Sequence, residues 1–186
     1  MLVTEAQREV RLTFLGGFPG QLVSGGLWLV SAALASSGRI RPAILVLVVG
    51  GMFIFPLTML LLRVMGRPSS LSAGNPLAGL AMQIAFTIPF SLPLVGAATL
   101  HHLNWFYPAL MVVVGAHYLP FVFVYGMWLF AVLAALMIGG GVWIGLTMPT
   151  TFSTGGWLTG AVLVLFALAG LAIARGEERQ GTPTSR

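Results

Sequence analysis

The long apolar stretches of this chain contain few side chains that could carry out chemistry. Gln83, Thr87 and Ser91 recur at intervals of four residues, so they share one face of a helix. His117, followed by Tyr118, is the one titratable side chain expected deep within an apolar segment. Such a histidine can relay a proton or ligate a metal or haem, or it can be a neutral imidazole hydrogen-bonded in the core.

Other polar side chains fall at a similar depth when each apolar segment is laid out at ~1.5 Å per residue. Gln21 and Ser24 belong to the first segment and Thr58 to the second. Because hydrocarbon cannot satisfy polar groups, side chains at this depth usually face protein or water. The pattern predicts a polar layer centred on His117, which is either a pocket open to the cytoplasm or a buried hydrogen-bond cluster.

The residue types that are missing restrict what this layer could catalyse. The chain has no Cys and no Lys, and no Asp or Glu lies between Glu9 and Glu177. Only a Ser–His or Tyr–His pair remains for nucleophilic chemistry, and one histidine without carboxylate or thiolate partners is a poor metal site. We therefore expect no enzyme activity, no metal and no cofactor.

Two prolines interrupt the segment that carries the Gln83 stripe. Pro89 and Pro93 remove the helical donors for the carbonyls of Ala85 and Pro89. A helix broken in this way can present backbone carbonyls to a substrate or an ion. The alternative is a kinked helix whose free carbonyls are satisfied by Thr87 or Ser91.

The elements that must position these residues are membrane spans. Hydrophobic residues make up 58% of the chain, charged residues 7%, and the mean hydropathy is +0.97. About 20 apolar residues cross the ~30 Å of hydrocarbon in a bilayer. We predict an all-α polytopic membrane protein with six spans, at 17–37, 42–63, 77–100, 105–124, 126–147 and 156–174. The uncharged run from Trp105 to Thr147 must fold back, most simply between Pro120 and Gly126.

Arginine placement predicts the orientation. Seven arginines lie on the side of the two termini and only Arg39 and Arg41 on the other side, which favours cytoplasmic N and C termini in a bacterial inner membrane. Residues 1–14 are expected to form an interfacial helix started by Thr4 and Gln7, and residues 176–186 a flexible tail around a transmembrane domain of residues 15–175. The arginines flank spans, so the net charge of +5 does not indicate nucleic-acid binding.

Internal similarity and small residues suggest further organisation. Val48–Ile54 aligns with Val113–Leu119 at an offset of 65 residues, which is consistent with duplicated two-helix hairpins or with chance recurrence of apolar residues. Small residues spaced by four let helices approach closely, within the chain or in a homo-oligomer. They are Gly16-Gly20-Ser24, Ala131-Ala135-Gly139, Gly141-Gly145 and Gly156-Gly160.

Several stretches are more specific than composition requires. They are residues 16–25, Gly74-Asn75-Pro76-Leu77, Asn104–Ala109, Gly115–Phe121 and Tyr125-Gly126-Met127. Over residues 8–147 the chain resembles a family of small bacterial membrane proteins known only as a domain of unknown function. The resemblance supports the membrane class, directs attention to Asn75 and His117, and implies no activity.

The leading hypothesis is a membrane protein that binds or translocates a small neutral or lipid-like ligand in a cytoplasm-facing pocket near His117. Its lining is drawn from Gln21, Ser24, Asn75, Gln83, Thr87, Ser91, His117 and Tyr118. The alternative is a structural or partner-binding subunit without a ligand site. An intramembrane enzyme is a less favoured third reading. The expected partners are membrane lipids and other copies of the chain.

Overall fold

The fold is taken from a computed structural model, which describes residues 1–147 and 152–181. All regular elements in these ranges are helices, as expected from the sequence. The helices are α1 (Val3–Thr13), η1 (Leu15–Gly17), α2 (Phe18–Ser36), α3 (Ile40–Gly51), α4 (Ile54–Val64), α5 (Leu77–Ala85), α6 (Thr87–His101), η2 (Leu103–Trp105), α7 (Phe106–Tyr118), α8 (Phe121–Tyr125), α9 (Leu129–Thr147) and α10 (Thr154–Gly181).

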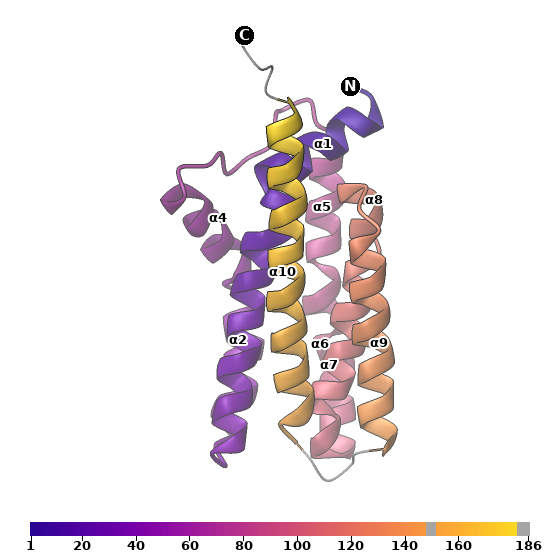
Figure 1. Cartoon of the computed structure of the whole chain (residues 1–186). Coiled ribbons are helices and arrows are strands. Elements are labelled where there is room, and N and C mark those ends of the chain that lie inside the picture. Colours follow the sequence, from indigo (N-terminus) through magenta and orange to yellow (C-terminus); the bar gives the residue numbers. More distant parts are fainter. Residues whose placement is uncertain (148–151, 182–186) are drawn as a thin grey trace.

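The long helices run up and down one bundle, with both termini at the same end (Figure 1). Five segments are long and apolar enough to cross a membrane: Leu15–Ser36, Leu77–His101, Leu103–Tyr125, Leu129–Thr147 and Thr154–Gln180. They agree with five of the six predicted spans. The expected reversal also occurs, because α8 ends at Tyr125 and Gly126 adopts a left-handed conformation at φ 61° before α9.

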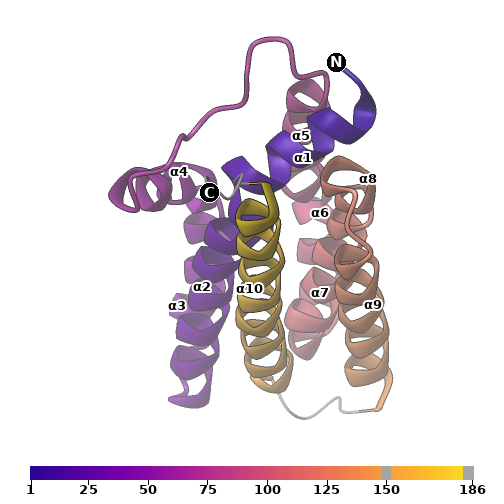
Figure 2. The ribbon, with the colours of Figure 1, turned by 45° about the horizontal axis from the view of Figure 1, so that its top comes forward.

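The second predicted span, 42–63, is not one continuous helix. It is broken at Met52 and Phe53 into α3 and α4, which meet at 65°, and α4 leaves the bundle sideways (Figure 2). Pro56 has no N–H for the Met52 carbonyl, and Gly50 and Gly51 precede the break. The sequence predicted the apolar length correctly but missed this bend.

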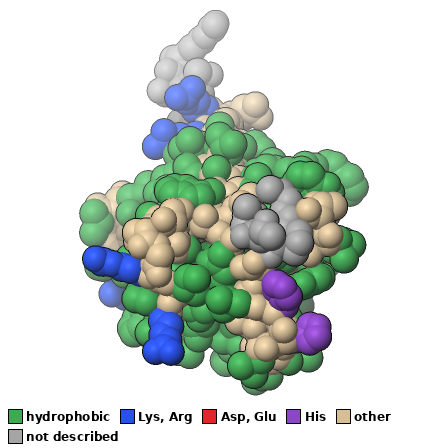
Figure 3. All heavy atoms as spheres, turned by 90° about the horizontal axis from the view of Figure 1, so that it is seen from below, with side chains coloured by type: hydrophobic (Ala, Val, Ile, Leu, Met, Phe, Trp, Pro, Cys, Tyr) green, Lys and Arg blue, Asp and Glu red, His purple; other side chains and the backbone are tan. Residues whose placement is uncertain are grey.

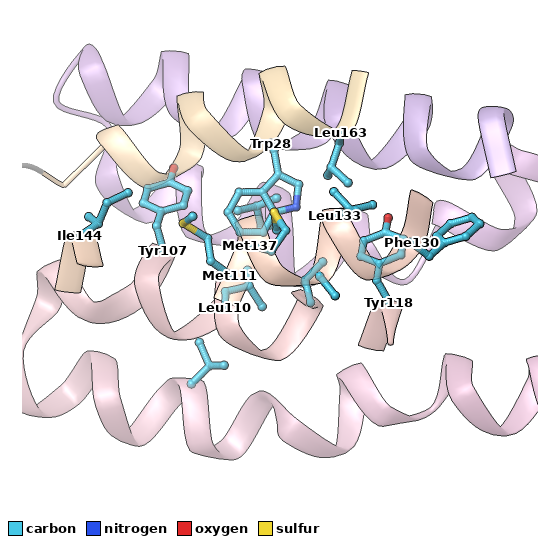
Figure 4. Close-up of a cluster of buried hydrophobic side chains, with 14 of the residues drawn as sticks. Trp28, Tyr107, Leu110, Met111, Tyr118, Phe130, Leu133, Met137, Ile144 and Leu163 are labelled. Atoms are coloured by element: carbon cyan, nitrogen blue, oxygen red, sulfur yellow. The ribbon is translucent and has the colours of Figure 1, made fainter. Parts of the chain in front are cut away.

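The core lies between α2, α7, α9 and α10 (Figure 4). Tyr107 is fully buried, its ring lies 5.8 Å from that of Trp28, and its hydroxyl is 2.6 Å from Ser31 Oγ. Ser31 also donates to the Ala43 carbonyl of α3 at 2.7 Å. One hydroxyl of α2 therefore joins three helices and leaves no unpaired polar group at this point of the core.

The short helix η1, just before α2, touches the later part of α10 through the backbone. A Cβ atom built on Gly16 would lie 2.3 Å from the Gly170 carbonyl oxygen, and one on Gly170 would lie 2.4 Å from that of Gly16. Gly16 also has φ +64°, which disfavours any side chain. Gly160 continues this close contact against Leu29. These glycines therefore pack within the chain.

The small residues predicted on α9 are of two kinds: some pack within the chain, and one is open. A Cβ on Gly141 would meet the Pro108 carbonyl at 2.8 Å, and one on Gly145 would meet Trp105 at 3.1 Å, so both hold α9 against α7 and η2. Gly139, in contrast, has open space where its side chain would be. Of these glycines in α9, Gly139 is therefore available for a contact with another copy of the chain. Gly141 and Gly145 are already used within the chain.

Gly170→Ala should strongly destabilise the protein, because its methyl group would overlap the backbone of Gly16. We expect a loss of about 1–3 kcal/mol, measured as a lowered melting temperature in detergent. Gly176→Ala in the same helix is the control, because nothing lies within 4 Å of its added carbon. Equal stability of the two variants would contradict the close contact.

Both ends of the chain are helical where the structure describes them. α10 continues to Gly181 through residues 176–181, which the sequence analysis assigned to a flexible tail; residues 182–186 lie outside the described ranges. α1 forms as predicted, but Thr4 does not cap it. The helix begins at Val3 and its N-cap residue is Leu2, whose N–H donates to Glu5 Oε2 at 2.9 Å.

The opposite end of the bundle is mainly apolar. Figure 3 shows arginine and histidine side chains there among hydrophobic ones, with no acidic side chain on the visible face. Arg39 and Arg41 follow the α2–α3 turn, and His101 and His102 lie where α6 ends. Charge is therefore distributed asymmetrically along the bundle.

Candidate functional site

His117 is held against the break between α5 and α6. Its Nδ1 atom lies 2.9 Å from the Ile84 carbonyl oxygen and 3.0 Å from Thr87 Oγ1. Thr87 itself donates to the Ile84 carbonyl at 2.7 Å. Because the Ile84 carbonyl oxygen can only accept, Nδ1 carries the hydrogen in this contact. Thr87 and His117 therefore bond to the Ile84 carbonyl, and not to the Ala85 or Pro89 carbonyl for which the sequence predicted a repair.

The same geometry bears on the nucleophile–base hypothesis. Thr87 Oγ1 is within hydrogen-bond reach of His117, as a nucleophile and its base would be. A nucleophilic hydroxyl would donate its hydrogen to the imidazole base, however, whereas the Thr87 hydroxyl donates to the Ile84 carbonyl. In this arrangement Thr87 is bonded to the carbonyl three residues before it in the chain.

An aromatic cluster extends from His117 towards the end of the bundle that carries the termini. The His117 ring lies 5.0 Å from Phe121, and Tyr118 and Tyr125 lie 6.1 Å and 4.7 Å from Phe130. Several pairs meet edge to face, the geometry that aromatic quadrupoles favour. Neither tyrosine hydroxyl has a hydrogen-bond partner among the residues that the structure describes.

Gln21 reaches this cluster from α2. It is only 3% exposed, and neither its Nε2 nor its Oε1 atom has a hydrogen-bond partner among the described residues. A Cβ built on Gly17 would lie 3.0 Å from the Phe130 ring and 3.7 Å from Gln21 Nε2, so the amide and the ring both lie close to Gly17. Ser24, one turn later, is also buried.

The remaining predicted residues are not brought into one pocket. Gln83 is exposed on α5, and Ser91 donates to the Thr87 carbonyl at 2.7 Å. The predicted set thus separates into Thr87, Ser91 and His117 at the helix break, Tyr118 in the aromatic cluster, and the buried Gln21 and Ser24 of α2.

Asn75 lies elsewhere and has a structural role. Its side chain donates to the Ala6 carbonyl at 3.1 Å and to Glu9 Oε2 at 2.9 Å, and accepts from the Leu77 N–H at 2.9 Å. Ser72 also donates to Glu9. These bonds start α5 and fasten the loop that precedes it to α1.

Ion pairs close the same end of the bundle. Arg11 forms a two-point pair with Glu177, with both N–O distances 2.8 Å, and its Nη1 donates to the Tyr125 carbonyl at 2.7 Å. Arg67 pairs with Glu178. Helix α1 is thereby bound to α10 and α8, directly beside the aromatic cluster.

The carboxylate of Glu9 is stabilised in its charged form. The Ser72 backbone N–H and then the Asn75 amide donate to it, which lowers the pKa of Glu9 below its ordinary value of 4.5. Glu177 raises the pKa of Arg11 in the same way. A lowered carboxyl pKa contributes stability that is complete above the ordinary value and is lost as the pH falls through the folded-state value.

We predict that acidification releases the loop of residues 68–76 from α1. Hydrogen–deuterium exchange, corrected for the intrinsic pH dependence, should show slow exchange of this loop at pH 6 and faster exchange as the pH falls below 4.5. In Glu9→Gln the loop should exchange quickly at both pH values. A loop that stays equally protected in both proteins would contradict the role of Glu9.

These ionic contacts and the attachment of the loop to α1 were not predicted from the sequence. Their signal was present, because all four acidic residues lie in the two terminal segments, which the six-span topology places at one end. Interpreting Glu177 and Glu178 as part of a tail concealed their pairing with Arg11 and Arg67.

The fold and the site define a class of protein. It is a helical bundle with five, or up to six, segments long and apolar enough to cross a membrane, closed at one end by ion pairs. The sequence profile of the Family of unknown function (DUF7010) matches residues 3–173. Because this match covers most of the chain, the protein belongs to that family, as the resemblance over residues 8–147 suggested. Comparisons with curated proteins and with solved structures found no match.

Proposed function

We propose that this protein is an integral membrane protein that binds a small uncharged molecule, carrying a hydrogen-bonding group and an apolar body, between Gln21 and the aromatic cluster. One observation carries the proposal: the amide of Gln21 is buried with both polar atoms unpaired. Leaving a buried polar group unpaired costs about 1–3 kcal/mol. The cost disappears when a bound molecule supplies the partner.

The surroundings of Gln21 support this choice of ligand. The rings of Tyr118 and Tyr125 pack against the same Phe130 ring, and their hydroxyls have no hydrogen-bond partner among the described residues. Aromatic faces and unpaired donors and acceptors suit an amide, alcohol or lipid headgroup without net charge. His117 is less suited to be the centre of the site, because Ile84 and Thr87 already occupy its Nδ1 atom.

Gln21→Leu should raise the melting temperature of the ligand-free protein in detergent, because it removes an unpaired amide of similar size. Relief of ~1–3 kcal/mol corresponds to an increase of several degrees. Gln83→Leu makes the same chemical change at an exposed position and should leave the melting temperature nearly unchanged. A lower melting temperature for Gln21→Leu would show that the amide is already satisfied, and would contradict the proposal.

The binding step is tested with the same pair of variants. A panel of neutral amides, alcohols and diacylglycerols should contain a compound that raises the melting temperature of the wild type and of Gln83→Leu, but not that of Gln21→Leu. At a hundredfold excess over Kd, binding adds ~2.7 kcal/mol of stability. A shift that survives in Gln21→Leu would exclude this site.

A structural or partner-binding subunit is the second candidate. It is favoured by a shallow apolar groove of about 300 Å³ lined by α9, α10 and Met111, in which Gly139 leaves room for another helix. If this candidate is correct, no compound of the panel raises the melting temperature of the wild type or of either variant, Gln21→Leu or Gln83→Leu. The protein also purifies as an oligomer. We do not propose an enzyme, because Thr87 donates its hydrogen to a carbonyl.

We further propose that both termini face the cytoplasm of a bacterial cell, with lipids as the surrounding partners. The arginine distribution supports this orientation: Arg8, Arg11, Arg63, Arg67, Arg175 and Arg179 lie at the end with the termini, against Arg39 and Arg41 at the other.

Because the chain has no Cys, single cysteines can report this orientation without background labelling. In intact cells, a membrane-impermeant maleimide should label Ser37→Cys in the α2–α3 turn. It should label Ser70→Cys, in the loop before α5, only after the cells are opened. The reverse pattern would invert the orientation without affecting the proposed ligand site.

A further inference from the structure

Helix α4 presents an apolar surface that nothing in the described structure covers. It packs on α2 through Thr58 and Leu62, which are 7% and 0% exposed. On its other sides Phe55, Leu60 and Val64 are 55–77% exposed. The view in Figure 2 shows the helix projecting sideways from the bundle, close to the end that carries the termini.

Helix lengths indicate where α4 lies in a bilayer. The 12 residues of α3, if they stand along the membrane normal, cover ~18 Å of a hydrocarbon layer that is ~30 Å thick. Tilted by 65°, the 11 residues of α4 add only ~7 Å of depth. The two helices together therefore fall short of the far boundary by ~5 Å.

A charged side chain lies at the end of α4, where the two helices fall short of the membrane boundary. Arg63 lies in the last turn of α4, is exposed, and has no ion-pair or hydrogen-bond partner within the described ranges. An arginine side chain can extend its guanidinium over a few ångströms to reach the interface while its stem stays among apolar groups. Such a guanidinium binds phosphate through two parallel hydrogen bonds.

We infer that α4 is an in-plane helix of the leaflet on the side of the termini, with Phe55, Leu60 and Val64 among acyl chains and Arg63 bound to the phosphate of an anionic phospholipid. The inference requires insertion in a membrane, but it is independent of the ligand site at Gln21. The exposed apolar side chains favour lipid as the occupant because the helix lies at the depth of the acyl chains.

Depth measurements on the full chain in nanodiscs test the orientation of α4. A fluorophore on Leu57→Cys and on Val64→Cys, quenched by nitroxides at known depths in the lipid, should report positions that differ by ~4 Å, against ~10 Å for an upright helix. Leu158→Cys and Leu165→Cys, also exposed and seven residues apart, provide the upright control on α10. A difference near 10 Å for the α4 pair would overturn the inference.

The lipid contact is tested separately with Arg63→Gln. Native mass spectrometry of protein exchanged into phosphatidylglycerol should show roughly fivefold weaker lipid retention than in the wild type. Arg63→Lys should retain part of this binding, and Arg8→Gln, at a residue beside Glu177, should leave it unchanged. Unchanged retention in Arg63→Gln, or an equal loss in Arg8→Gln, would overturn the assignment of Arg63.

Discussion

Polar groups within the bundle must find their partners inside the protein, because hydrocarbon offers none. This constraint explains where charge is kept. All four acidic residues lie at one end, and Arg11, Arg67 and the carboxylates of Glu177 and Glu178 join the first and last helices there. The paired side chains of Arg11 and Glu177 are 17% and 24% exposed, so solvent screens them less than an ordinary surface pair.

The same end requires close contact between backbones. Gly16 and Gly170 allow η1 and α10 to touch, and Gly16 and Gly17 adopt φ values of 64° and 89° between α1 and α2. This turn lets α1 fold across the end of the bundle, where Arg11 reaches α10. The ion pairs and the glycine contact are therefore mutually dependent, since a wider separation of α2 and α10 would move Arg11 away from Glu177.

Much of the fold could be predicted because apolar length is a direct signal of spans. Five of the six segments and the reversal before α9 agree with the structure. The bend between α3 and α4 was missed because Pro56 and two glycines can produce either a kink or a break, depending on tertiary contacts. The polar layer was predicted by depth alone, which cannot distinguish Gln83, exposed on α5, from Gln21, buried on α2. The internal duplication stays a prediction.

Two irregular elements of the fold lie near the start of α2, which carries Gln21. The left-handed turn at Gly16 and Gly17 precedes it by one turn of helix, and Thr58 of the bent helix α4 lies 3.6 Å from a Cβ built on neighbouring Gly20. A regular up-and-down bundle would need neither the turn nor the bend. A buried polar group without a partner is rare in a folded protein and calls for an explanation. The Gln21 amide is such a group, whereas Nδ1 of His117 is paired at the helix break. This is why the buried amide, and not the histidine, is the stronger indication of a binding site.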